Sequence, residues 1–281
     1  MHVWHYLIPK KPALTLEHLN TLTLEHITME ITFLGTGTSG GVPLIGCQCE
    51  VCKSADPRDK RLRTSLLIKT HGLTIVIDCG PDFRQQMLRE DVRHVDAILM
   101  THLHKDHTGG LDDIRSFNFI NKKAVDIYCD ADTEAGIREQ YSYIFKDTGY
   151  PYLPQMNFIR VEDEAFKIGN LDIQPINVMH AWMPVKAYRF GHFTYITDAK
   201  TIKPEELAKI KGTRVLVINA LRPEEHYSHL NVDEALQIVN EIKPETTYLI
   251  HMSHQFGFHA DMEKSLPKGI IPAYDGLKIE V

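Results

Sequence analysis

The stretch Thr101-His102-Leu103-His104-Lys105-Asp106-His107-Thr108-Gly109-Gly110 places four metal-ligating side chains within six residues. It follows residues 97–100, an apolar run typical of a buried strand. Because a buried imidazole or carboxylate needs a polar partner, such crowding at one strand end has little value for packing. The pattern indicates a pair of divalent metal ions, with His102 and His104 toward one ion and Asp106 and His107 toward the other.

Three further ligand candidates follow apolar runs in the second half of the chain. His180 ends the run 173–179, Asp198 follows 193–196, and His251 follows 247–250. Each residue alone is compatible with a structural role, but their shared place at strand ends favours one common site. Asp198 is the natural bridge, because a carboxylate can give one oxygen to each of two cations.

Short apolar runs rich in β-branched residues recur along the chain and predict strands. Helices are predicted between them, which favours a layered α/β fold with helices on the outer faces of sheets. The domain is expected at 29–281, and residues 1–28 are expected to form an appendage. A Tyr-rich insert at about 131–154 is a candidate lid or homodimer surface. The predicted strands are 29–34, 65–69, 73–77, 97–100, 125–128, 173–179, 193–196, 214–218 and 247–250, and the predicted helices are 81–90, 132–145, 203–211 and 232–241, with Asn231 as an N-cap.

The charge pattern argues against a polyanionic partner. The 281 residues carry 31 Lys and Arg against 37 Asp and Glu, a net charge of −6, and contain no long basic run. We therefore expect no stable nucleic-acid complex. No apolar run approaches the length of a membrane span, and the start lacks the apolar core of a signal peptide. These features predict a cytoplasmic protein without membrane association.

A second cluster, Cys47, Cys49 and Cys52, follows a glycine-rich turn. Cys-x-Cys is too close for an easy disulfide, whereas three thiolates in a tight loop suit a structural Zn²⁺. His254, three residues after His251, is the candidate fourth ligand. The alternative is that these cysteines pack as small apolar residues. Cys79 and Cys129 lie beside apolar runs and are predicted to be core thiols.

The glycine turn itself fits a nucleotide-binding pattern only in form. Gly35-Thr-Gly37-Thr-Ser-Gly40 has the spacing G-x-G-x-x-G after a strand. A dinucleotide site needs a helix to begin there, but the turn leads into the cysteine loop. The glycines more simply permit a sharp turn near the metals.

With Asp78 added, the order Asp, His-x-His-x-Asp-His, His, Asp, His resembles the metallo-β-lactamase-fold hydrolases. The resemblance covers roughly residue 29 to the C-terminus and implies a four-layer αββα sandwich. It implies that Asp78 orients the ligand turn. It further implies a first ion held by His102, His104 and His180, a second held by Asp106, His107 and His251, and Asp198 as the bridge.

Within that superfamily, the glycine turn, the cysteine loop and His251-Met-Ser-His254 are similar to the PhnP-like phosphoribosyl 1,2-cyclic phosphate phosphodiesterases. That resemblance implies that His254 completes the structural zinc site with the three cysteines. It also implies an active-site histidine upstream of His251. His229 matches that position, and His226 is a nearby rival.

The expected function is therefore hydrolysis of a small phosphodiester, such as a cyclic ribose or nucleotide phosphate. Two catalytic divalent ions, Zn²⁺ or Mn²⁺, would supply the nucleophile, and His229 would protonate the leaving group. Asp106 and Asp78 would fix the ligand geometry. Three alternatives stay open: a tRNA 3′-processing endoribonuclease, a thioester or lactone hydrolase, and a non-catalytic metal-binding protein.

Overall fold

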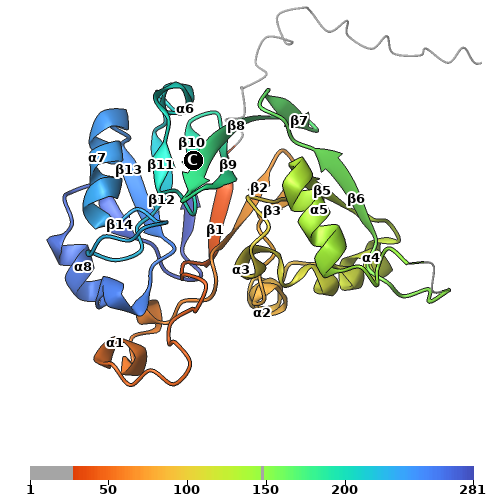
Figure 1. Ribbon diagram of the computed structural model, residues 1–281, viewed down its shortest axis with the longest axis horizontal. Coiled ribbons are helices and arrows are strands. Elements are labelled where there is room, and N and C mark those ends of the chain that lie inside the picture. Colours follow the sequence, from red (N-terminus) through yellow and green to blue (C-terminus); the bar gives the residue numbers. More distant parts are fainter. Residues whose placement is uncertain (1–27, 147–148) are drawn as a thin grey trace, which may run out of the picture.

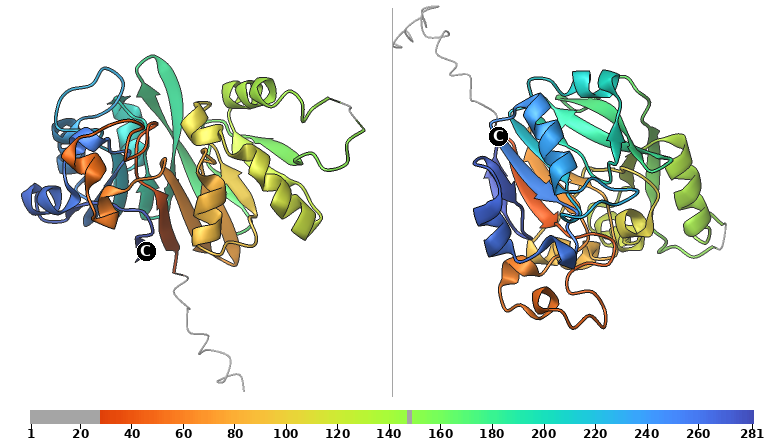
Figure 2. Two further views of the ribbon diagram at one scale, coloured as in Figure 1. Left: turned by 90° about the horizontal axis from the view of Figure 1, so that it is seen from below. Right: turned by 60° about the vertical axis from the view of Figure 1, so that its left-hand side comes forward.

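The computed structural model describes residues 28–146 and 149–281. Two β-sheets pack face to face, and helices cover both outer faces (Figures 1 and 2). The predicted αββα sandwich is confirmed. The predicted appendage lies outside the described residues except for Thr28, so it stays a prediction.

The first sheet has an antiparallel half and a parallel half. β3 to β6 run parallel, with Ile77 of β3 opposite Leu99 of β4, so the chain leaves these two strands at the same edge. The strand order is β15 (Lys278–Glu280), β1 (Glu30–Gly35), β2 (Ser65–Thr70), β3 (Leu73–Ile77), β4 (Ala97–Leu99), β5 (Val125–Cys129) and β6 (Met156–Arg160).

The second sheet is also mixed. A long antiparallel pair, β8 and β9, lies beside a parallel group formed by β10, β12, β13 and β14. Its order is β11 (Thr201–Ile202), β8 (Leu171–His180), β9 (Met183–Phe190), β10 (Phe193–Tyr195), β12 (Val215–Asn219), β13 (Thr246–Ile250) and β14 (Ile270–Pro272), with β7 (Phe166–Ile168) paired to β8.

Three apolar cores hold the four layers together. The central core lies between the sheets, where Phe33 of the first sheet packs against Tyr248 of the second with ring centroids 5.3 Å apart. Helices α2 (Phe83–Arg89), α4 (Arg115–Asn121) and α5 (Ala131–Gln140) cover the first sheet. Helices α6 (Pro204–Lys209), α7 (Val232–Ile242) and α8 (His259–Ser265) cover the second. The remaining helical turns are α1 (Glu50–Lys53), α3 (Lys105–Thr108), η2 (Pro57–Asp59), η3 (Leu111–Ile114) and η4 (His254–Phe256).

Most predicted elements are present with shifted ends. The helix expected at 132–145 is α5, which ends at Gln140. Asn231 caps α7 as predicted. Its side chain accepts a hydrogen bond from the Glu234 N–H, and the Glu234 side chain accepts one from the Asn231 N–H, which forms a capping box. The prediction lacked α4, β6 and β9.

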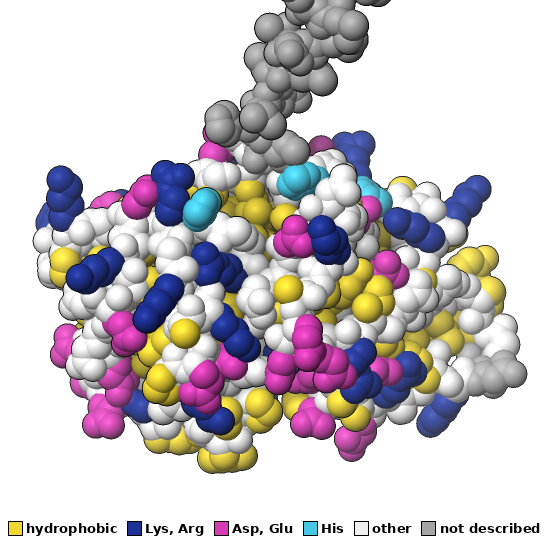
Figure 3. Space-filling model, turned by 90° about the horizontal axis from the view of Figure 1, so that it is seen from above, with side chains coloured by type: hydrophobic (Ala, Val, Ile, Leu, Met, Phe, Trp, Pro, Cys, Tyr) yellow, Lys and Arg dark blue, Asp and Glu magenta, His cyan; other side chains and the backbone are white. Residues whose placement is uncertain are grey.

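No helix in the described ranges is both long and apolar enough to cross a membrane. On the face seen in Figure 3, acidic and basic side chains are interspersed.

Candidate metal centre

The predicted ligands lie where strands of both sheets end. Asp78 follows β3, Asp198 comes three residues after β10, and His251 follows β13. All three adopt the left-handed backbone conformation, with φ of +62°, +54° and +56°. This conformation costs a residue with a side chain about 1–2 kcal/mol. In this conformation the backbone turns sharply at the end of each strand, and the three side chains come together at one edge of the sheets.

The seven predicted ligand residues converge. Together with His229, all of them except His104 fall into three overlapping groups, and within each group the ligand atoms lie within 4.8 Å of one another. The groups are His102, His107 and Asp198; Asp106, His107 and His251; and His180, Asp198 and His229. His104 joins them through ring contacts, at centroid distances of 4.7 Å to His102 and 5.2 Å to His180. Asp198 belongs to two of these groups, and its role as a bridge stays a prediction.

One ring nitrogen of His107, of His180 and of His251 is fixed by a neighbour. His107 Nδ1 lies 2.6 Å from Asp78 Oδ2, and the same carboxylate accepts bonds from the backbone and hydroxyl of Thr101. His180 Nδ1 lies 2.7 Å from the carbonyl oxygen of Ser228. His251 is held through Nε2, which lies 3.2 Å from Thr38 Oγ1. These contacts set the ring orientations before any ion binds.

The opposite nitrogens point into the cluster. His107 Nε2 lies 3.2 Å from an oxygen of Asp106 and from one of Asp198, and His251 Nδ1 lies 3.3 Å from Asp198 Oδ2. These two nitrogens and His102 Nε2 are buried and make no hydrogen bond among the described residues, which is costly unless a ligand satisfies them. One tethered nitrogen and one nitrogen turned toward carboxylates on the same ring is the arrangement of a metal-ligating histidine. The residues present therefore fit a pair of divalent ions.

The electrostatics of the cluster favour bound cations. Burial lowers the pKa of His102 and His251, which keeps these rings in the neutral form that ligates metals. Burial acts the same way on His107, but Asp198 and the other nearby carboxylates outweigh it and raise the pKa of His107. The carboxylates thus favour a positive charge on the His107 ring. A bound cation would supply that positive charge instead of the proton.

Helix α5 holds the ligand turn from outside, which the sequence did not predict. Tyr141 donates from its hydroxyl to the Thr108 carbonyl at 2.8 Å, and Gln140 donates to the Leu103 carbonyl at 3.0 Å. Gly136 leaves room for the turn, because a Cβ there would lie 3.2 Å from the Leu103 side chain. The segment predicted as an insert thus includes a helix that supports the centre.

His229 belongs to the cluster, whereas its rival lies farther out. His229 Nδ1 is buried 3.6 Å from Asp198 Oδ1, and its ring centroid is 4.4 Å from that of His180. Burial, followed by the nearby His251, lowers the pKa of His229 to about 3. His226 is only half-buried, with its ring 5.3 Å from the His229 ring. Of the two histidines, His229 is the one that lies against the side chains of the centre.

The cysteine loop forms a separate cluster. The sulfurs of Cys47, Cys49 and Cys52 and a nitrogen of His254 all lie within 4.8 Å of one another. His254 Nδ1 is 3.3 Å from Cys49 Sγ, and this contact lowers the pKa of that thiol to about 6. Burial raises the pKa of Cys52 to about 11. Three sulfurs and one imidazole suit a structural Zn²⁺. Cys79 and Cys129 are buried in the apolar core, as predicted.

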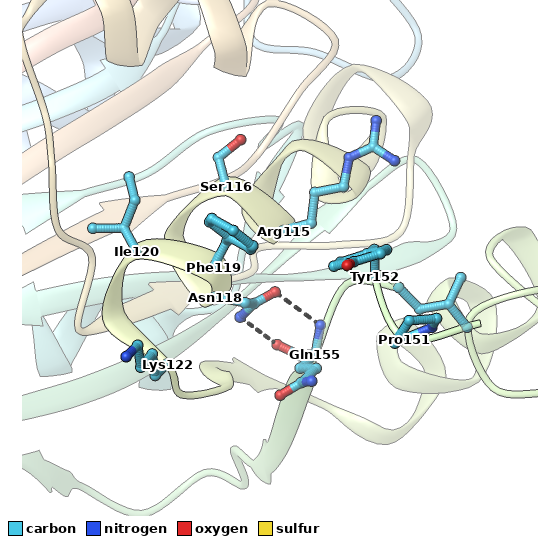
Figure 4. Close-up of a pocket in the computed structure, with 10 residues that line it drawn as sticks. Arg115, Ser116, Asn118, Phe119, Ile120, Lys122, Pro151, Tyr152 and Gln155 are labelled. Atoms are coloured by element: carbon cyan, nitrogen blue, oxygen red, sulfur yellow. Dashed lines mark hydrogen bonds between the residues drawn. The ribbon is translucent and has the colours of Figure 1, made fainter. Parts of the chain in front are cut away.

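A cavity of about 640 Å³ lies apart from both clusters, between α4 and residues 151–155 (Figure 4). Asn118 joins its two walls through a pair of hydrogen bonds to the Gln155 backbone. Its charged lining residues in the described part of the chain are Arg115 and Lys122, and none of the described lining residues is a histidine, a cysteine or an acid. These described residues offer no such metal ligand, whereas the histidine and aspartate cluster does.

Comparisons with known proteins agree with this geometry. Residues 74–252 match the Beta-lactamase superfamily domain. A solved structure described as a new diphosphatase from the PhnP family superposes with a TM-score of 0.85 and is 38% identical, covering 91% of this chain and 98% of its own.

Two curated relatives carry other names. The octanoyltransferase of Porphyromonas gingivalis is 41% identical over 253 residues, which is 89% of this chain. The ribonuclease Z of Methanococcus maripaludis is 28% identical over 166 residues, which is 58% of this chain. The chain spans about half of the length of each of these relatives, 51% and 48%.

Proposed function

This chain belongs to the metallo-β-lactamase superfamily, and on that premise we propose that it is a metal-dependent phosphodiesterase that hydrolyses a small phosphodiester. A cyclic ribose or nucleotide phosphate is the substrate class we favour. The observation that carries the proposal is the convergence of seven ligand side chains with His229 beside them. The likeness to a PhnP-family diphosphatase supports phosphorus as the centre attacked.

The residues that would hold the two catalytic ions are those of the cluster. His102, His104 and His180 would hold one ion, and Asp106, His107 and His251 the other, with Asp198 between them. Bound divalent ions supply Lewis acidity, which makes water a nucleophile near neutral pH and offsets negative charge on a phosphoryl group. Zn²⁺ and Mn²⁺ both suit this nitrogen and oxygen donor set.

The chain's own residues prepare this site and handle one proton. Asp78 and Thr38 fix the rings of His107 and His251, so the ligand geometry exists before substrate arrives. In its protonated form, His229 would donate a proton to the oxygen of the leaving group. The negative charge of a bound phosphodiester raises the pKa of an adjacent imidazole and so favours the protonated form that can act as this acid.

The central experiment measures hydrolysis by protein loaded with Zn²⁺ or Mn²⁺, on bis(p-nitrophenyl) phosphate and a panel of cyclic phosphodiesters. We expect turnover that His104→Ala reduces by roughly 10³-fold or more, because an ion contributes several kcal/mol of transition-state stabilisation. His94→Ala, which removes a half-exposed imidazole paired with Asp96, is the matched control. A fully loaded wild-type protein inert toward every diester would disprove the proposal.

The role of His229 is tested by the choice of leaving group. We expect His229→Ala to lower turnover of a cyclic phosphate, whose alkoxide leaves poorly, by about 10² to 10⁴-fold. The loss on the p-nitrophenyl diester should be much smaller, because that leaving group needs no proton. Metal content measured by elemental analysis should stay unchanged. Equal losses on both substrates would place His229 among the metal ligands instead.

A tRNA 3′-processing activity is the second candidate, and the ribonuclease Z relative is the observation that favours it. Salt-sensitive binding of precursor tRNA with cleavage of its 3′ trailer would establish that activity. We propose instead that the partner is a small molecule and that no stable nucleic-acid complex forms.

Acyl chemistry is a third candidate, and the octanoyltransferase relative is the observation that favours it. This chain matches only 51% of that protein, so the activity in its name can belong to the other half. Hydrolysis of an octanoyl thioester by the loaded protein would favour this alternative. The cytoplasmic location and a homodimer stay predictions.

A further inference from the structure

Two large aromatic side chains are exposed beside the metal centre. Trp182 is 82% exposed and lies two residues after His180, and Tyr227 is 72% exposed and lies two residues before His229. A tryptophan or tyrosine buries 150–250 Å² when it packs, so exposure at both positions leaves much apolar surface in water. Neither ring contributes to the three apolar cores.

The two loops that carry these rings are joined at the centre. Trp182 lies in the tight turn between β8 and β9, where His180 pairs with Met183. Ala181 takes the left-handed conformation there, with φ of +53°, which fixes the course of the turn. The bond from His180 to the Ser228 carbonyl, 2.7 Å long, ties this turn to the loop that carries Tyr227.

A line of rings leads outward along that loop from the centre to solvent. The ring of His229 lies 4.8 Å from that of His251, and the ring of His226 lies 5.3 Å from that of His229. The ring of Tyr227 is tilted by 37° against that of His226, with centroids 4.8 Å apart, and it ends the line in solvent. Burial falls along this line, from His251 in the centre to Tyr227 at the surface.

We propose that Trp182 and Tyr227 form a stacking subsite for a nucleobase, so that the phosphodiester cleaved at the centre is part of a nucleotide. This inference rests on the proposed function and narrows its substrate class. A nucleotide carries a planar ring a few bonds from its phosphorus. With the phosphoryl group at the centre, the ring would extend toward these loops. Aromatic side chains stack on any base through its π-face, so the subsite would tolerate several bases.

A substrate without a base would gain nothing from these rings. A cyclic ribose phosphate would occupy only the metal centre and His229, and both aromatic side chains would stay in water. The subsite therefore predicts a difference in affinity between ligands that share a phosphate and differ in the base. The base could belong to a free nucleotide or to the end of an RNA, which experiment can separate.

Tryptophan fluorescence reports this contact directly. The chain has two tryptophans, so Trp4→Phe leaves Trp182 as the sole reporter. We expect AMP to quench its emission in full-length, Zn²⁺-loaded protein, whereas ribose 5-phosphate should leave the emission unchanged. In calorimetry, Trp182→Ala and Tyr227→Ala should each weaken AMP binding about 5- to 100-fold. Binding of ribose 5-phosphate should change less than twofold.

Phe119→Ala is the matched control, because Phe119 is 73% exposed on α4 and away from the centre. It should bind AMP like the wild type. If AMP and ribose 5-phosphate bind equally, or if neither loop variant alters AMP binding, the inference is wrong. Tighter binding of an oligonucleotide ending in adenosine than of AMP would identify an RNA end as the source of the base.

The inference and the proposed function fail separately. Loss of the AMP preference with continued hydrolysis of a base-free cyclic phosphate overturns only the stacking subsite. A loaded protein that binds AMP through Trp182 but hydrolyses no diester overturns the phosphodiesterase assignment.

Discussion

The two metal-ligating clusters of this protein are built in opposite ways. The histidine and aspartate centre gathers its seven ligand side chains from the ends of four strands in both sheets, β4, β8, β10 and β13, and most of these side chains are buried. The thiolate cluster takes three ligands from one loop of six residues and a fourth from η4, and only Cys52 among them is buried.

This difference predicts a different relation to folding. The centre is formed by strands whose positions are fixed by three apolar cores, so the fold prepares it without an ion. The cysteine loop has little apolar burial of its own, so an ion would supply much of its order. Removing metal should therefore abolish activity at the first cluster and lower stability at the second.

Among changes that leave every predicted ligand in place, the largest effect should come from loosening the centre. Asp78→Asn keeps the size of the side chain but removes the charge that holds His107 and accepts three bonds. We expect metal affinity at the centre to fall about 10- to 100-fold, measured by competition with a fluorescent chelator. Asp59→Asn, another buried carboxylate, is the control and should affect stability alone. Unchanged metal affinity in Asp78→Asn would mean that the ion, and not the fold, fixes the orientation of the His107 ring.

A stability effect should follow from Cys49→Ser. Elemental analysis should show one ion fewer per chain, with the two ions of the centre retained. The melting temperature should fall by roughly 2–4 °C for each kcal/mol of stability lost. Turnover per loaded centre should stay within about twofold. If this variant instead emptied the centre, the two clusters would be one coupled unit and the comparison would fail.

The smallest effect is a pH dependence of the metal-free protein. The contact with His254 lowers the pKa of Cys49 from 9.0 to about 6, so between these values the folded state binds fewer protons than the unfolded state. Stability from this group is therefore complete above pH 9 and is lost as pH falls toward 6. The difference in melting temperature between wild type and Cys49→Ser, both stripped by chelator, should grow from pH 6 to pH 9. A constant difference would contradict the shift.

The ligand set could be predicted because each member follows an apolar run. A strand must end near the edge of its sheet, so His102, His180 and His251 were assigned to one place from their sequence context alone. His229 has no strand before it, and only the resemblance to a known group singled it out. The four-layer fold likewise came from that resemblance, since strands and helices alone permit several α/β folds.

Other features depend on tertiary contacts that no short pattern encodes. β9 contains Pro184 and a buried lysine, Lys186, whose ammonium group binds Asp163 and Asn177 from neighbouring segments. Thr38 lies in the glycine turn, whose sequence is accounted for by the backbone freedom of glycine alone. The sequence therefore does not predict the contact of Thr38 with His251. The support from Tyr141 joins positions 33 residues apart through a backbone carbonyl, which leaves no mark on side-chain chemistry.

The left-handed backbone at Asp78, Asp198 and His251 limits how the centre can be altered or copied. A β-branched residue such as valine would be forced out of its favoured conformations at all three places, whatever its effect on a metal, so loss of function there is ambiguous. Asparagine tolerates this conformation and is the cleaner replacement for either aspartate. A designer who transplants the seven ligands onto another sheet would have to import the bent strand ends with them, because straight strands would point the same side chains elsewhere.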